Sequence, residues 1–288
     1  MKLENQTIIF LMLTQIIYSL IQGIAETFPI SSSAHIFLTD FFSKKIPFLA
    51  NKMTPLPAEI MPLLDVCLHM GSFFAIIIYF RKTLWKIVSG VFSGIFKLQH
   101  TPGLSGLLMI IMATIPTIIV GYFSKKYFKI PITLLSLGIA FVVFGLLHMI
   151  SEKMTTPEDS VISFRQAIII GVAQVLALVP GSSRLGVCVT ASRFLKIKPW
   201  QGIEFAFILS LPVLLGAASL STYDFYKTGG NLQLVLNLWP IIAGTFIVNL
   251  MMFPILRRLV MRFSLFIFGL YRFLLGSFLI YYSYFLMK

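Results

Sequence analysis

Hydrophobic residues gather into long runs along this chain, and short stretches containing Lys and Arg separate the runs. Six runs are uninterrupted and rich in Leu, Ile, Val, Phe and Met. Each approaches the roughly 20 apolar residues needed to cross the hydrocarbon core of a bilayer. They predict transmembrane helices at Leu63–Phe80, Leu104–Phe123, Ile132–Ile150, Gly202–Leu220, Leu236–Leu256 and Leu265–Leu286.

Two further apolar runs are broken in the middle by proline and hydroxyl residues. Ile8–Phe42 contains Pro29-Ile30-Ser31-Ser32-Ser33, and Ala167–Leu195 contains Pro180-Gly181-Ser182-Ser183-Arg184. Proline removes a helix donor and disfavours helix at the residue before it. Irregular backbone at membrane depth must be buried in protein or line a wet cavity. We therefore expect two re-entrant helical hairpins, called the first and the second hairpin below.

The two hairpins resemble each other. Aligning Pro29 with Pro180 places Ser31 over Ser182 and Ser32 over Ser183, and three predicted spans follow each hairpin. An odd number of crossings inverts the second copy relative to the first, which is the inverted-repeat plan of many membrane proteins. The alternative is chance similarity of two short runs. The prediction is an all-α polytopic membrane protein, a single domain over residues 1–288, with inverted repeats of roughly 1–150 and 160–288.

Composition supports lipid as the solvent of this chain. Hydrophobic residues make up 58% and charged residues 11%, whereas soluble domains have about a quarter of their residues charged. The net charge of +13 does not indicate nucleic acid, because no basic region has the length or aromatic spacing of such a module. The basic residues fall mostly between spans, as Arg81, Lys82, Lys86 and Lys97 do. Their distribution favours both termini outside.

Polar residues inside the apolar segments concentrate in the two hairpins. Arg184 and Arg272 lie deep within apolar runs, where ionisable groups are costly and usually functional. In the first hairpin Gln22 lies four residues before Glu26, on one helix face. If Ser31–Thr39 is helical, His35 shares a face with Ser31 and Ser32.

The second hairpin has the features of an anion site. Gly181 lets the backbone approach a ligand closely, and a helix that begins near Ser182, Ser183 and Arg184 presents free N–H groups. A guanidinium can hold phosphate through two bonds. Glu26 makes sense as a metal ligand, or as the group that orients His35, and a carboxylate beside a pyrophosphate favours a divalent cation with oxygen ligands, Mg²⁺ or Ca²⁺.

Each of these residues alone also has a purely structural interpretation. The serines can be helix caps, His35 a satisfied core histidine, and Arg184 a structural partner of Glu26 or Glu204. Taken together, an acid, hydroxyls and a histidine in one break and Gly-Ser-Ser-Arg in the other favour an anion site. That interpretation requires the two hairpins to meet.

At these residues the chain resembles the undecaprenyl-pyrophosphate phosphatases of the BacA type. Gln22-x3-Glu26-x2-Pro29-x-Ser31-Ser32-x2-His35 is similar to one family motif, and Pro180-Gly181-Ser182-Ser183-Arg184-x-Gly186 to the other. The resemblance extends over essentially the whole chain, with similar residues at Asp65, Gly71-Ser72, Gln174, Glu204 and Tyr271-Arg272. The chain departs from the family pattern at Ala34, Leu185 and Cys188, where Gly, Ser and Thr are usual.

The resemblance implies hydrolysis of undecaprenyl pyrophosphate to the monophosphate and phosphate. It implies recycling of the carrier lipid for peptidoglycan, bacitracin resistance, a divalent metal, and an outward-facing site in a bacterial inner membrane. The expected partners are this lipid, the bilayer and a second copy of the chain in a homodimer.

These residues suggest a mechanism. Glu26 and Gln22 position the metal and the pyrophosphate, and His35 is a general base acting on Ser32 or on a water. Arg184, helped by Gly181, Ser182, Ser183 and Arg272, binds phosphate and stabilises its charge. Two rival functions remain open: a transporter or flippase of a lipid phosphate or other anion, and a scaffold or receptor without chemistry.

Overall fold

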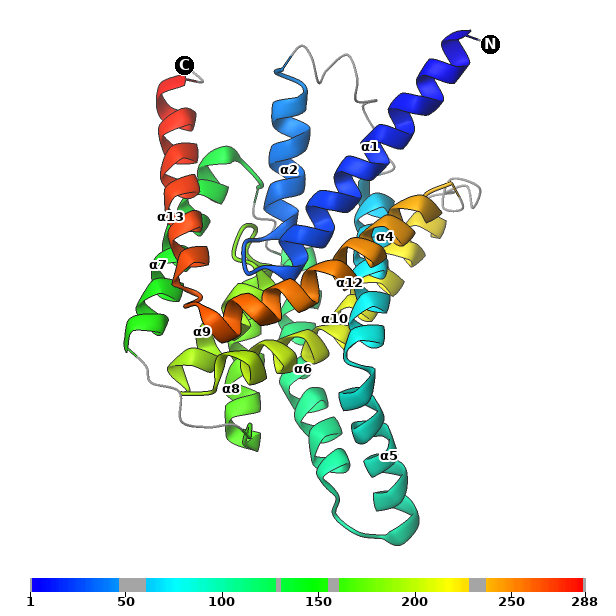
Figure 1. Ribbon diagram of the computed structural model, residues 1–288, viewed down its shortest axis with the longest axis vertical. Helices are drawn as coiled ribbons and strands as arrows, with labels where there is room; N and C mark the ends of the chain where they lie inside the picture. Colours follow the sequence, from blue (N-terminus) through cyan, green and yellow to red (C-terminus); the bar gives the residue numbers. More distant parts are fainter. Residues whose placement is uncertain (1, 47–60, 128–130, 155–160, 228–236, 287–288) are drawn as a thin grey trace. The chain divides into compact units, whose positions relative to one another are not determined.

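All regular structure in the described part of the chain is helical. The structure is a computed structural model that describes residues 2–46, 61–127, 131–154, 161–227 and 237–286. These ranges contain no strand, so the predicted all-helical class is confirmed. The helices (Figure 1) are α1 (Lys2–Thr27), α2 (Ser32–Ser43), α4 (Met61–Tyr79), α5 (Arg81–Lys97), α6 (Pro102–Tyr127), α7 (Leu134–Met154), α8 (Phe164–Gln174), η1 (Val175–Leu178), α9 (Arg184–Phe194), α10 (Pro199–Lys227), α12 (Trp239–Arg262), α13 (Phe266–Tyr281) and η2 (Tyr282–Leu286).

Five of these helices are long and apolar enough to cross a membrane. They are Pro102–Ser124, Leu134–Lys153, Pro199–Lys227, Trp239–Arg262 and Phe266–Phe285, and they correspond to five of the six predicted spans. Leu236, a predicted span start, lies outside the described residues. The sixth predicted span, Leu63–Phe80, is α4, which qualifies only together with α5, from which it is bent by 74°. The chain is therefore a multi-pass membrane protein.

The segment that follows Phe80 differs from the prediction. Its basic residues were expected between two spans, whereas Arg81–Lys97 forms α5. Gly90 allows α5 to pack closely on α6, because a Cβ there would lie 2.7 Å from the Cα of Gly103. The Thr101 hydroxyl donates to the Gly90 carbonyl at 2.6 Å and closes the turn between the two helices. The predicted orientation stays a prediction, and the segments 47–60, 128–130 and 228–236, which it also used, lie outside the described residues.

Both predicted interruptions are breaks between helices. The first separates α1 from α2 at Phe28–Ser31, and the second separates η1 from α9 at Val179–Ser183. Ser31 and Ser183, each immediately before a helix, have positive φ angles of 75° and 66°. Such a conformation costs a non-glycine residue about 1–2 kcal/mol. The backbone therefore matches Ser31 with Ser183, one residue away from the alignment on proline. That the hairpins are re-entrant and inverted copies stays a prediction.

The chain divides into two compact units. Unit 1 consists of Met1–Thr27, Ser32–Ala75 and Leu214–Phe253, and unit 2 of Phe28–Ser31, Ile76–Val213 and Pro254–Lys288. Both breaks therefore belong to unit 2, and Phe28 stacks on Phe268 of α13 with ring centroids 5.3 Å apart. Neither the single domain nor the predicted repeat halves are tested by this division.

Unit 1 has its core where α1, α4 and α12 pack together. A buried cluster contains Tyr18, Leu63, Leu64, Cys67, Leu68, Leu238 and Ile241. Small residues bring α1 against α12: a Cβ on Gly23 would lie 2.5 Å from Val248, and one on Gly244 would lie 2.8 Å from the Ser19 hydroxyl. This packing fixes the helix that leads to the first break.

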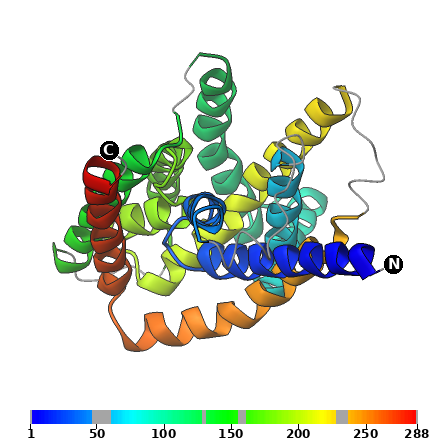
Figure 2. The same cartoon turned by 90° about the horizontal axis from the view of Figure 1, so that it is seen from above.

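Unit 2 pairs α7 with α13, which lie side by side in both views (Figures 1 and 2). Two glycines on each helix, seven residues apart, allow the close approach. A Cβ on Gly138 would lie 3.0 Å from the Gly276 carbonyl, and one on Gly145 would lie 2.8 Å from the Gly269 carbonyl. Small residues at regular spacing are a common basis of helix packing in membranes. They hold Arg272, on α13, inside the unit.

Candidate active site

A carboxylate and a hydroxyl meet at the first break. Glu26 lies in the last turn of α1, and Ser32 is the first residue of α2. The chain reversal brings them together, and the Ser32 hydroxyl donates to Glu26 Oε2 at 2.6 Å. Both side chains are buried. Two of the predicted site residues, Glu26 and Ser32, are thus in direct contact within unit 1.

Gln22, one turn before Glu26, contacts a residue that the sequence did not single out. Its amide nitrogen donates to Nδ1 of His69 at 3.3 Å. The other ring nitrogen of His69 lies 3.6 Å from Asp65 Oδ1. Asp65 and His69 are four residues apart on α4, a spacing that places them on one helix face and that could have revealed the pair.

The positions of Ser31 and His35 correct one step of the sequence argument. The prediction that both share a helix face required helix from Ser31, but α2 begins at Ser32 and Ser31 has a positive φ. Ser32 and His35, three residues apart in α2, do share a face. The Ser32 hydroxyl nevertheless donates to Glu26. The carboxylate therefore occupies the position of a proton acceptor at Ser32.

The second break is shaped by Gly181, Ser183 and Arg184. Gly181 has a φ of 87°, and a Cβ there would lie 3.2 Å from both Leu137 and Ala140. The Ser183 hydroxyl accepts from the Gly186 N–H at 3.1 Å and caps α9. Arg184 opens α9, and its Nη1 lies 3.5 Å from the Ser210 carbonyl. The break thus begins a capped helix with a guanidinium at its first position.

Arg272 reaches the second break from α13. Its side chain is buried, and Nη2 donates to the Gly181 carbonyl at 2.9 Å. The guanidinium carbon lies 5.6 Å from the ring centroid of Phe141 and 5.9 Å from that of Phe144, within the range of cation–π attraction. Unit 2 therefore brings together two residues that the sequence predicted for one site, Gly181 and Arg272.

Two buried polar atoms at this break lack hydrogen-bond partners among the described residues. They are Ser182 Oγ and Arg272 Nε. The same part of the chain contains no carboxylate that forms an ion pair with Arg272. Buried donors are normally satisfied, because an unsatisfied one costs about 1–3 kcal/mol. A buried cation and an unused hydroxyl beside a helix N-terminus are suited to an anionic ligand.

The predicted site residues fall into two sets. Gln22, Glu26 and Ser32 lie in unit 1 with His35, whereas Gly181, Ser182, Ser183, Arg184 and Arg272 lie in unit 2 with Ser31. The two breaks that carry Ser31 and Gly181 belong to the same unit. That all of these residues act on one ligand stays a prediction.

Glu26 and Gln22 fit a divalent cation whose other ligands are phosphate oxygens and water. In the residues described, no three His, Cys, Asp or Glu side chains lie close enough to hold a metal ion by themselves. Mg²⁺ in phosphate chemistry is usually held by one or two carboxylates, with substrate oxygens and water completing its shell. Glu26 and Gln22 offer a carboxylate and an amide oxygen of this kind.

The fold and the two breaks define a class: a polytopic helical membrane protein with buried acid, hydroxyl and guanidinium groups. Comparison with known families makes the class specific. The model of the family described as bacitracin resistance protein BacA matches residues 15–278. The chain belongs to this family, which is that of the undecaprenyl-pyrophosphate phosphatases.

Two of the three departures from the family pattern have local explanations in unit 2. Cys188 is buried in α9, and its thiol donates to Gln174 Oε1 at 3.7 Å, so it joins the two arms of the second hairpin. Gln174 in turn donates to the Thr117 hydroxyl at 3.2 Å. Leu185 is buried and apolar, as packing in a helix bundle requires. Ala34, in unit 1, is also buried.

Proposed function

We propose that this protein hydrolyses undecaprenyl pyrophosphate to undecaprenyl phosphate and inorganic phosphate. The observation that carries the proposal is the buried hydrogen bond from Ser32 to Glu26 at a helix break of a BacA-family chain. A carboxylate that accepts a serine proton is the arrangement of an activated nucleophile. A scaffold without chemistry has no need to bury such a pair in a membrane, where polar groups are costly.

In the proposed reaction the terminal phosphorus is attacked on the side opposite the bridging oxygen. Ser32 Oγ, or a water in its place, forms the new P–O bond while Glu26 takes the proton. The bond between the terminal phosphorus and the bridging oxygen breaks, and undecaprenyl phosphate leaves. If Ser32 is the nucleophile, a water then hydrolyses the phosphoserine and releases phosphate. His35, on the same face of α2 as Ser32, is suited to activate that water.

The guanidinium groups of Arg184 and Arg272 provide positive charge to balance the negative charge of the pyrophosphate. Phosphoryl transfer depends mainly on positioning and on stabilising the charge of the equatorial oxygens. Arg272 Nε and Ser182 Oγ have donor capacity that no described residue uses. Arg184, at the start of α9, adds a second planar guanidinium at the positive end of the helix dipole. We assign these residues, with Gly181, Ser183 and Ser31, to phosphate binding.

A bound Mg²⁺ or Ca²⁺ would neutralise part of the pyrophosphate charge, and Glu26 and Gln22 would hold it. We place the protein in the bacterial inner membrane with the site facing outside, and two re-entrant hairpins in an inverted repeat are the architecture that fits this placement. Release of the monophosphate there recycles the lipid carrier for peptidoglycan synthesis. Removal of the pyrophosphate also deprives bacitracin of its target. The predicted homodimer stays a prediction.

The test is phosphate release by purified protein in detergent micelles with undecaprenyl pyrophosphate as substrate. Hydrolysis produces phosphate without any gradient, whereas a transporter produces none. We expect the wild type to be active, and Glu26→Gln and Arg184→Lys to be strongly impaired. Near-wild-type release by both variants would refute the assignment of the residues. No release by the wild type, with or without divalent cations, would refute the function.

A further inference from the structure

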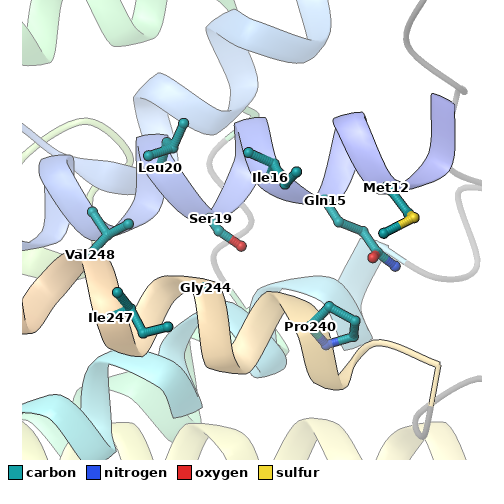
Figure 3. A pocket seen from close by; sticks show the side chains of 9 residues that line it. All are labelled: Met12, Gln15, Ile16, Ser19, Leu20, Pro240, Gly244, Ile247 and Val248. Atoms are coloured by element: carbon teal, nitrogen blue, oxygen red, sulfur yellow. The ribbon is translucent and has the colours of Figure 1, made fainter. Parts of the chain in front are cut away.

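A groove of about 200 Å³ runs between α1 and α12 in unit 1. Figure 3 shows the side chains that line it, five from α1 and four from α12: Met12, Gln15, Ile16, Ser19, Leu20, Pro240, Gly244, Ile247 and Val248. Because Gly244 has no side chain and Ser19 has a small one, the two helices approach closely at the floor. Larger apolar side chains form the walls.

The two polar residues of the groove are already bonded to the backbone of unit 1. Gln15 Nε2 donates to the Asn237 carbonyl at 3.4 Å, and Ser19 Oγ donates to the Ile241 carbonyl at 3.2 Å. Both side chains are buried. Met12, Ile16, Leu20 and Ile247, by contrast, are exposed. The surface that the groove offers to an occupant is therefore apolar, and in a membrane it opens to the hydrocarbon.

The position of the groove relates it to the first break. Ser19, on its floor, lies seven residues before Glu26, and this spacing returns to the same face of a helix. Leu20, at the inner end, precedes Glu26 by a rise of about 9 Å along α1. The helices close at Gly23, whose Cβ would lie 2.5 Å from Val248. A linear apolar chain in the groove would thus end one and a half turns from the carboxylate.

We infer that this groove binds the first isoprene units of the prenyl chain of the substrate, an inference that rests on the proposed function. A pyrophosphate at Glu26 and the first part of its tail cover the distance from the carboxylate to Leu20. The tail can enter from the bilayer, because Met12, Ile16 and Ile247 on the walls of the groove are exposed. Binding of the chain in this groove aligns the pyrophosphate with α1.

The kinetic test compares two Leu→Trp variants of the full-length protein with similar starting exposure. Leu20 lines the groove and is 44% exposed, whereas Leu215 on α10 in the same unit is 50% exposed and lies outside it. We expect Leu20→Trp to raise KM for undecaprenyl pyrophosphate about tenfold with little change in kcat, as loss of burial for about two methylene groups predicts. Leu215→Trp should keep wild-type values. An unchanged KM in Leu20→Trp would overturn the inference.

A binding test does not depend on hydrolysis. A prenyl pyrophosphate carrying a benzophenone near the head end of its chain is photolysed with the wild-type protein in nanodiscs, and the adducts are mapped by mass spectrometry. We expect adducts within residues 12–20 or 240–248, reduced by excess undecaprenyl pyrophosphate and not by phosphatidylglycerol. Adducts elsewhere, or equal competition by phosphatidylglycerol, would show that the groove is not a substrate site.

The two tests separate failure of the inference from failure of the function. If the wild type releases phosphate and the adducts lie outside the groove, the proposed function stands and the groove assignment is wrong. If the wild type releases none while the probe labels the groove specifically, the groove binds a prenyl pyrophosphate and hydrolysis is wrong.

Discussion

Ser32 donates a hydrogen bond of 2.6 Å to Glu26 across the break between α1 and α2. The distance is in the range of charge-assisted O–H···O⁻ bonds, which are shorter and stronger than neutral ones. Such a bond orients the hydroxyl and makes its oxygen more nucleophilic, because the carboxylate draws the proton away. The break is therefore more than an interruption of a helix, since it holds an acid and an alcohol in one fixed geometry.

Removing either member of this pair should abolish most activity. We expect Glu26→Gln to lower kcat by about 10²–10⁴, the range for loss of a positioned proton acceptor. Ser32→Ala should have a comparable effect if Ser32 is the nucleophile, and a smaller one if a water takes that role. The measurement is initial-rate phosphate release from undecaprenyl pyrophosphate in detergent.

The neighbouring serine provides a matched control. Ser33 follows Ser32 in α2, and its side chain is exposed. Ser33→Ala removes the same hydroxyl one residue away and should retain wild-type turnover. If Ser33→Ala were as impaired as Ser32→Ala, the loss would reflect the local helix and not the bond to Glu26.

Arg272 and Arg193 are both buried arginines, and replacement by methionine should change thermal stability in the second and not in the first. Arg272 has no carboxylate partner among the described residues, so Arg272→Met removes an uncompensated buried charge. Replacing a buried charge by a well-packed apolar side chain is often neutral or stabilising. The loss of its bond to Gly181 acts against this by about 1 kcal/mol. We expect thermal stability in detergent close to that of the wild type and a KM raised about 10- to 100-fold.

Arg193→Met is the comparison. Arg193 forms a buried ion pair with Glu152, which also accepts from the Ser264 hydroxyl at 3.1 Å. Breaking a buried pair by removing one partner costs about 3–5 kcal/mol, because the other charge remains buried. This variant should melt at a clearly lower temperature. Equal loss of stability in both variants would show that Arg272 has a structural role and not a ligand-binding one.

Gly186 controls the position of Arg272. A Cβ at Gly186 would lie 2.9 Å from Arg272 Nη1 and 3.1 Å from the Ser183 Cβ, so the guanidinium would have to move. Alanine otherwise favours a helix over glycine by about 1 kcal/mol. We expect Gly186→Ala to keep its stability and to lose at least about tenfold in kcat/KM, an amount that corresponds to about 1.4 kcal/mol.

Gly216→Ala makes the same change in helix α10 where nothing lies within 4 Å of the added Cβ. It should leave activity unchanged and raise thermal stability slightly. Thermal unfolding and phosphate release, measured on both variants, separate the effect on Arg272 from the effect of glycine itself. Wild-type kcat/KM in Gly186→Ala would contradict the proposed position of the guanidinium.

The length of the apolar runs was sufficient to predict the all-helical class and five of the spans, because a span needs only length and hydrophobicity. It failed at Arg81–Lys97, where the basic residues suggested a short loop, whereas the segment is a helix that packs on α6 through Gly90. The proline positions predicted both breaks. The proline positions did not predict that the second break is one residue longer than the first. The reason is that each following helix begins after a serine with positive φ, Ser31 or Ser183.

The residues of the candidate site stay predictions, and the structure adds contacts among them that the sequence did not indicate. Spacing along one helix relates Gln22 to Glu26, but only the chain reversal shows that Ser32 donates to Glu26. His69 and Glu152 came from other helices, and no local pattern connects them with Gln22 or Arg193. Arg193 is buried near the end of α9 and pairs with Glu152, which is 41 residues away in sequence, so sequence spacing did not indicate the pair.

The protein should bind a divalent cation tightly only when the pyrophosphate is also bound. No cluster of three acidic, histidine or cysteine side chains exists in the described residues, so Glu26 and Gln22 alone should hold a free cation weakly, with a Kd above about 10⁻⁴ M. We expect EDTA to abolish phosphate release, and Mg²⁺ or Ca²⁺ to restore it. Calorimetric titration should detect tight Mg²⁺ binding only with a non-hydrolysable pyrophosphate analogue present. Because Glu26 supplies the one carboxylate, Glu26→Gln should remove that coupling, whereas Ser33→Ala should keep it. Full activity in EDTA would exclude the metal from the reaction.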